Sequence, residues 1–119
     1  MTGLPRGEPA TLHDHRHGEG GLDGAAVDAA GLIWCARWGS GCVDAYSPDG
    51  DRVRSVAVPA TRPSCPTFAG NDLTQLLVTS AYEGMDDDEK AADPEHGRTF
   101  LIDLGVRGLL EPRVRLSGA

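Results

Sequence analysis

The fold is decided by the stretch Gly21-Leu-Asp-Gly-Ala-Ala-Val-Asp-Ala-Ala-Gly-Leu-Ile-Trp-Cys-Ala-Arg-Trp38. It begins as a loop that delivers one acidic side chain, Asp23, to the start of a strand. A short strand at 25–28 ends in a turn at 29–31, where Gly31 suits the positive φ that a tight turn favours. Residues 32–38 are apolar almost throughout, which is typical of a buried strand. The stretch therefore predicts two strands joined by a tight turn.

The residues that follow extend this pair into a meander. Residues 42–47 alternate between apolar and polar side chains, as a half-exposed strand does. The segment Pro48-Asp49-Gly50-Asp51 is a strong hairpin signal, and residues 52–58 alternate as an outer strand should. Four short strands with short connections predict one four-stranded antiparallel sheet.

A second, weaker copy of this unit begins after the prolines at 59–63. It offers strands at 65–69, 75–81 and 98–103, an acidic loop at 83–96, and only a weak fourth candidate at 114–116. Trp34 and Leu77 align at an offset of about 43 residues, the size of one four-stranded propeller blade. Because radial repetition of such sheets gives a β-propeller, we predict an all-β fold of about two blades. A seven-stranded β-sandwich is the alternative that strand spacing leaves open.

The predicted domain organisation follows from these units. We expect a flexible lead-in at 1–20, a partial propeller at 21–116 with blades at 21–59 and 60–104, and a tail at 105–119. Propellers have about 4 to 8 blades, so two blades cannot close a ring by themselves.

Composition narrows the functional classes. The 119 residues carry a net charge of −7, much of it in the acidic segment, which argues against nucleic-acid or anionic-membrane partners. No apolar run approaches the roughly 20 residues of a membrane span, and the first residues lack a secretory signal, so we expect a cytoplasmic protein. Cys35, Cys42 and Cys65 form no C-x-x-C pair, and we expect reduced, mostly buried thiols.

Several blocks resemble, in order and spacing, the C-terminal portion of the regucalcin (senescence marker protein)/gluconolactonase family. The resemblance covers about residues 20–116. It is carried by residues 22–43, Tyr46-Ser-Pro-Asp-Gly50, residues 64–73, Leu77-Val-Thr-Ser-Ala81 and Gly105-Val-Arg-Gly-Leu109.

This resemblance implies a six-bladed propeller that hydrolyses sugar lactones with one divalent metal, Ca²⁺ or Zn²⁺. The metal ligands it implies are a Glu, an Asn and an Asp, and only the Asp maps onto this chain, at Asp23. The family's proline before that Asp is Leu22 here. A carboxylate that touches metal and water can orient the water or take its proton, so Asp23 is the predicted catalytic and metal-binding residue. An Asp that merely turns the loop is the structural alternative.

Other candidates are weaker. His13, His15 and His17 would share one face of an extended strand and could bind Zn²⁺ or Ni²⁺, although nothing in a Gly-flanked arm orients the rings. Arg37 and Trp38 would either edge a channel mouth or stack on each other at the surface. Ser64 and Cys65 lack a nearby base, and the acidic run 86–89 lacks the spacing of a calcium loop.

Two functions follow as hypotheses. In the first, the chain is a fragment of a metal-dependent sugar-lactone hydrolase and is inactive alone, because most metal ligands lie outside it. In the second, it is a non-catalytic blade module that self-associates, or completes a partner lacking these blades, through its open strand edges.

Overall fold

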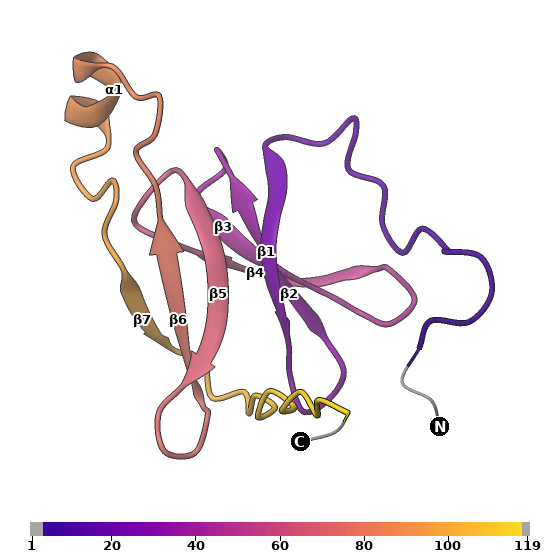
Figure 1. Cartoon of the computed structure of the whole chain (residues 1–119). Helices are drawn as coiled ribbons and strands as arrows, with labels where there is room; N and C mark the ends of the chain where they lie inside the picture. The colour runs from indigo at the N-terminus through magenta and orange to yellow at the C-terminus, as the bar shows by residue number, and fades with distance from the viewer. Residues whose placement is uncertain (1–3, 118–119) are drawn as a thin grey trace.

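The computed structural model describes residues 4–117, which form two antiparallel sheets and one short helix (Figure 1). The first sheet has the order β1-β2-β3-β4 and the second the order β5-β6-β7. Each sheet is a meander in which consecutive strands are neighbours. No helix in this part of the chain is long and apolar enough to cross a membrane.

The first sheet contains β1 (Gly21–Val27), β2 (Ile33–Trp38), β3 (Cys42–Tyr46) and β4 (Arg52–Ala57). Its four strands are those predicted, but β1 begins four residues before the predicted start. The two additional pairs, Gly21 with Trp38 and Leu22 with Arg37, lie beyond an irregularity in the register between Leu22 and Ala25. Asp23 therefore lies within a strand, at an irregular point of its pairing.

The second sheet contains β5 (Pro63–Ala69), β6 (Gln75–Ser80) and β7 (Phe100–Asp103). The weak strand expected at 114–116 is absent from the described residues, where this segment is exposed coil. The expected register between blades was wrong by one residue. Trp34 is the second residue of β2 and its fully buried equivalent in β6 is Leu76, because strand alternation turns Leu77 to the other face.

The acidic segment predicted as a loop contains a helix, α1 (Asp87–Ala92). The Asp86 side chain accepts a hydrogen bond from the Glu89 N–H, and the Glu89 side chain accepts one from the Asp86 N–H. This capping box supplies partners for amide groups that a helix start leaves unpaired. The dense negative charge of the segment hid this local signal.

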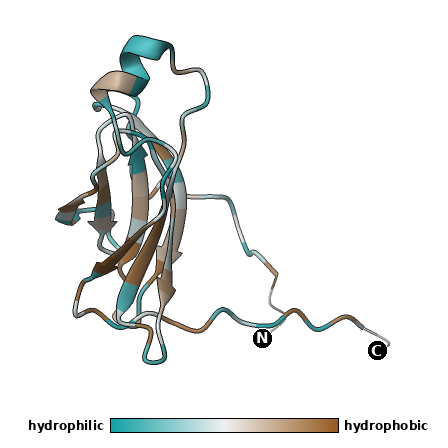
Figure 2. Cartoon of the chain, turned by 90° about the vertical axis from the view of Figure 1, so that its left-hand side faces the viewer, coloured by the Kyte–Doolittle hydropathy of each residue, from teal (hydrophilic) through white to brown (hydrophobic). Residues whose placement is uncertain are grey.

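The core lies between the two sheets. Its buried members are Trp34, Val43, Ala45, Val58, Leu76 and Val78. Figure 2 shows hydrophobic residues concentrated on the strands and hydrophilic ones at the helix and turns. The first strands of the two sheets also meet, since β5 lies against both β1 and β2.

The buried carboxylate of Asp28 organises the turn between β1 and β2. Its Oδ1 accepts hydrogen bonds from the backbone N–H groups of Ala30 and Leu32, both at 2.9 Å. Its Oδ2 accepts a third from the indole Nε1–H of Trp34, also at 2.9 Å. Burial of a carboxylate requires such partners, and here they join the turn to the largest side chain of the core.

The segment after β7 crosses beneath both sheets and joins their turns. Gly108 forms an isolated antiparallel bridge with Asp28, and its N–H donates to the carbonyl of Leu73. The Ala29 N–H donates to the carbonyl of Arg107. This crossing fixes the β1–β2 turn to the β5–β6 turn.

Replacing Asp28 by asparagine should lower the free energy of unfolding by about 2 kcal/mol or more. An asparagine keeps the shape, but its NH₂ group must face one of the three donors that now point at the carboxylate. Urea denaturation measures the effect, and Asp49→Asn in the exposed β3–β4 turn is the matched control. Equal stability of the two variants would contradict the role given to Asp28.

Candidate functional site

Asp23 lies on β1 with its side chain exposed. The start of β1, the start of β5 and α1 are at the same end of the molecule (Figure 1). Within residues 4–117, no side chain forms a hydrogen bond or an ion pair with the Asp23 carboxylate. The carboxylate is therefore available to a ligand at this end.

The backbone beside Asp23 is held from two strands. The Cys35 thiol of β2 lies 3.4 Å from the Asp23 carbonyl oxygen and donates to it, while also reaching the Ala36 carbonyl at 3.6 Å. Burial raises the pKa of the Cys35 thiol, which keeps it protonated and able to donate. On the other side, Gly24 packs against Cys65 of β5.

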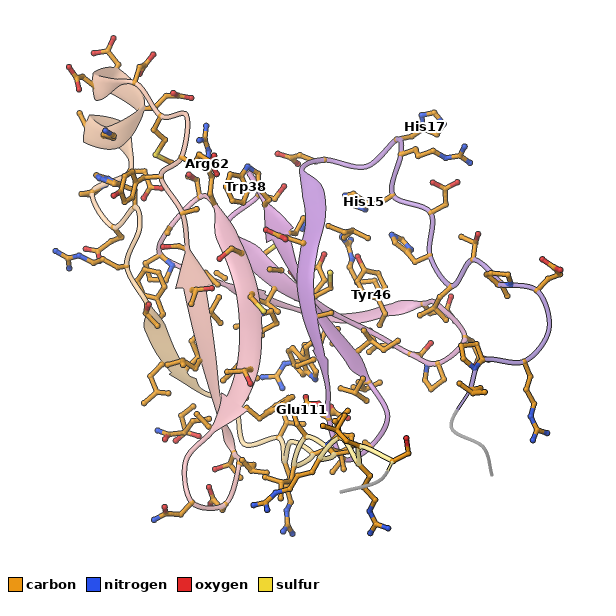
Figure 3. All side chains as sticks on the ribbon, in the orientation of Figure 1. His15, His17, Trp38, Tyr46, Arg62 and Glu111 are labelled. Atoms are coloured by element: carbon orange, nitrogen blue, oxygen red, sulfur yellow. The ribbon has the colours of Figure 1, made fainter. Side chains whose placement is uncertain are left out.

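A second group of side chains lies at this end, between the sheets and α1. Arg62 extends over the Trp38 ring, with its guanidinium carbon 5.6 Å from the ring centroid, and Figure 3 shows the two side by side. Arg62 also donates to the Glu83 carbonyl and pairs with Glu89 at 3.2 Å. A cavity of about 310 Å³ lies beside them. Trp38 therefore stacks on Arg62 rather than on Arg37.

Arg37 belongs instead to a buried polar cluster that sequence reasoning missed. Its Nε lies 3.1 Å from the Asp44 carboxylate, and its Nε and Nη2 donate to the Cys42 sulfur. Burial raises the pKa of the adjacent Tyr46 hydroxyl, and the charge of Asp44 adds to that effect. Alternation along β3, which puts Cys42, Asp44 and Tyr46 on one face, was the available signal.

The N-terminal arm covers this cluster. The His13 ring packs on Tyr46 at a centroid distance of 4.5 Å, and His13 Nε2 lies 3.3 Å from His15 Nδ1. His15 Nε2 lies 2.8 Å from the carbonyl oxygen of Glu19. His17 lies apart from His15, at an outer bend of the arm (Figure 3). The structure thus brings together two of the three histidines singled out above.

The remaining sequence candidates have structural partners. The Ser64 hydroxyl is 2.7 Å from that of Thr79, which is not a base. Cys35 and Cys42 are buried as expected, whereas Cys65 is exposed, because it lies on the first strand of its sheet at the β1 contact; all three are free thiols. The acidic run caps and begins α1.

The side chains present do not complete a metal site. Hard divalent ions take about six oxygen ligands, and zinc takes four ligands. In the described part of the chain, no three His, Cys, Asp or Glu side chains converge so as to hold a metal ion. Asp23 offers one carboxylate, so further ligands would have to come from outside these residues.

Comparison with known proteins places this geometry in context. Residues 3–82 match the family model described as SMP-30/Gluconolactonase/LRE-like region. A Rhizobium meliloti protein named for sugar lactone lactonase activity is 54% identical over 115 residues, covering 97% of this chain and 39% of that protein. The L-arabinolactonase of Azospirillum brasilense is 40% identical over 95 residues, covering 80% of this chain and 31% of that protein.

A solved structure agrees with this match. The calcium-binding protein regucalcin from Agrobacterium tumefaciens superposes with a TM-score of 0.91 at 47% identity, covering 97% of this chain and 39% of that one. The chain thus spans less than two-fifths of the length of these relatives. The neighbours are regucalcin-type propeller proteins, which confirms the predicted partial propeller over the sandwich alternative.

The contact between Asp93 and Thr61 should make the α1 segment sensitive to acid. Burial acts to raise the pKa of Asp93, but hydrogen bonds from the Thr61 N–H (2.9 Å) and hydroxyl (2.7 Å) outweigh it, and the pKa lies below its usual 3.8. Because the folded pKa is lowered, the stabilisation is present above pH 3.8 and is lost as pH falls through the folded value.

We therefore expect the unfolding free energy to fall more steeply below pH 3.8 in the native chain than in Asp93→Asn. Denaturation at a series of pH values measures this difference. Asp87→Asn, an exposed change in the first turn of α1, should leave the native pH dependence in place. Parallel curves for the native chain and Asp93→Asn would refute the assignment.

Proposed function

The chain belongs to the SMP-30/gluconolactonase/LRE-like family, and we propose that it is one part of a sugar-lactone hydrolase to which it contributes the catalytic carboxylate of Asp23. The observation that carries the proposal is the state of this side chain. Asp23 is exposed at one end of the inner strand β1, without a partner among the described residues, while its backbone is fixed from two neighbouring strands.

This arrangement suits lactone hydrolysis, which needs a water made nucleophilic next to the ring carbonyl. An unpaired carboxylate on a fixed backbone can orient such a water or accept its proton. We assign Asp23 this role, and we propose that it is also one ligand of a divalent metal such as Ca²⁺ or Zn²⁺. The relatives named above are lactonases, and a regucalcin is described as calcium-binding, which supports both assignments.

The missing ligands define the rest of the proposal. Since one carboxylate does not hold a metal, the chain alone is inactive, and activity requires residues supplied by further propeller blades. Sugar lactones are the proposed substrate class. The alternative of a non-catalytic module that self-associates, or completes a partner, stays a prediction; the edge strands β4 and β7 are what such pairing would use.

An assembled enzyme tests the function directly. This chain, joined in place of the matching 39% of the Rhizobium meliloti protein, should hydrolyse gluconolactone, and the isolated chain should not. Asp23→Asn in the assembled enzyme should lower kcat about 10²-fold or more, because the base and ligand are lost together. Asp49→Asn, the same chemical change in an exposed turn, is the control. An inactive assembled enzyme, or one unaffected by Asp23→Asn, would refute the proposal.

A second candidate function, metal binding by the N-terminal arm, is favoured by the position of two histidines. A tetrahedral ion with bonds of about 2.0–2.1 Å holds two nitrogens about 3.3 Å apart. That is the separation between His13 Nε2 and His15 Nδ1. The Glu19 carbonyl fixes the proton of His15 on Nε2 and leaves Nδ1 free to bind a metal.

Titration with Zn²⁺ or Ni²⁺ should separate the pair from the third histidine. His13→Ala and His15→Ala should each weaken binding about tenfold or more, and His17→Ala should leave it unchanged. Asp23→Asn should also have no effect, which distinguishes this site from the catalytic one. Equal losses for all three histidines would contradict the two-ligand assignment.

A further inference from the structure

Gly24 and Cys65 make an unusually close contact between the inner strands of the two sheets. A Cβ atom built on Gly24 would lie 2.5 Å from the Cys65 sulfur, 2.7 Å from its Cβ and 2.9 Å from its Cα. Real Cβ atoms do not approach other heavy atoms so closely, so no residue larger than glycine fits unless one of the strands moves. The separation of β1 from β5 at this level is therefore set by the Cys65 side chain alone.

The contact involves the peptide unit of the candidate catalytic residue. Gly24 follows Asp23 directly, and both fall at the irregularity in pairing between Leu22 and Ala25. A regular ladder does not hold the backbone here. Its restraints are the Cys35 thiol, which donates to the Asp23 carbonyl at 3.4 Å, and the Cys65 side chain, which packs on Gly24.

The second sheet shows the same irregularity at the matching place. The pairing of β5 with β6 shifts between Pro63 and Cys65, close to the contact with β1. Both inner strands thus depart from regular pairing where they meet. A backbone without regular ladder bonds is easily re-aimed, and packing across the contact must supply the missing restraint.

We propose that Gly24 and Cys65 are positioning residues that set the direction of the Asp23 carboxylate. The thiol fills the space that a side chain at Gly24 would need, and the absence of that side chain lets the sulfur press on the Asp23–Gly24 backbone. Neither residue touches the reacting atoms. The consequence for catalysis rests on the function proposed above, whereas the contact itself does not.

A double-mutant cycle in the full chain tests the contact. Gly24→Ala should lower the folded-to-unfolded equilibrium constant at least about tenfold, because the methyl group overlaps Cys65. Cys65→Gly removes both the sulfur and the Cβ, so Gly24→Ala should cost much less in that background. Gly21→Ala is the matched control, since it lies on the same strand with open space around its Cβ position.

The positioning role has its own readout in the same variants. The ¹³Cγ resonance of Asp23 should shift in Gly24→Ala and return towards the native position in Gly24→Ala/Cys65→Gly. In the assembled lactonase, Gly24→Ala should lower kcat by up to about 10²-fold, the effect of a small misplacement of a catalytic group, and Cys65→Gly should restore much of it. Rescue from a different strand separates positioning from a local sequence effect.

Each outcome bears on the proposal. Restoration of both the Asp23 resonance and stability by Cys65→Gly supports it. A cost for Gly24→Ala that is the same in both backgrounds, or an Asp23 resonance that Cys65→Gly does not restore, overturns it. If the assembled enzyme with the native chain is inactive, the proposed function fails, and the cycle and resonance in the chain still decide the positioning role.

Discussion

The hydrogen bonds accepted by the buried carboxylate of Asp28 are the constraint on which the rest of the structure depends. They close the turn between β1 and β2, and through Trp34 they connect that turn to the core. The same turn bonds to the segment at Arg107 and Gly108, which is joined in turn to the β5–β6 turn. One end of β1 is thereby fixed against both sheets. The other end carries Asp23.

The aspartates show how the molecule separates structural from chemical carboxylates. Asp28, Asp44 and Asp93 are buried, and each has donors or cations that satisfy it: amides and an indole, arginine with neighbouring polar groups, and a threonine. Asp23 is exposed and has no such partner among the described residues. A buried carboxylate without partners is costly, whereas an exposed one is free to bind water or a cation. The contrast supports Asp23 as the residue left for chemistry.

Much of the fold could be predicted because strand alternation and turn residues are local signals. The turn at Gly31 and the buried strand around Trp34 needed no tertiary information. The start of β1 could not be found in this way, since its pairing is interrupted next to Asp23. The helix α1 was missed because its acidic residues resemble a solvated loop, although Asp86 and Glu89 form a capping box. For the site, the family resemblance indicated Asp23, but no sequence pattern shows that Cys65 would lie against Gly24.

The crossing of the chain at Arg107 and Gly108 also has a consequence for the order of folding. Synthesis makes the β1–β2 turn early, yet the Ala29 amide and the Asp28 bridge have partners close to the other end of the chain. Long sequence separation makes such contacts slow to form, because the intervening chain must be ordered first. While the chain is still emerging from the ribosome, the first blade is therefore a pre-folded hairpin array with an unfinished turn. The second blade must dock before the last residues can complete it.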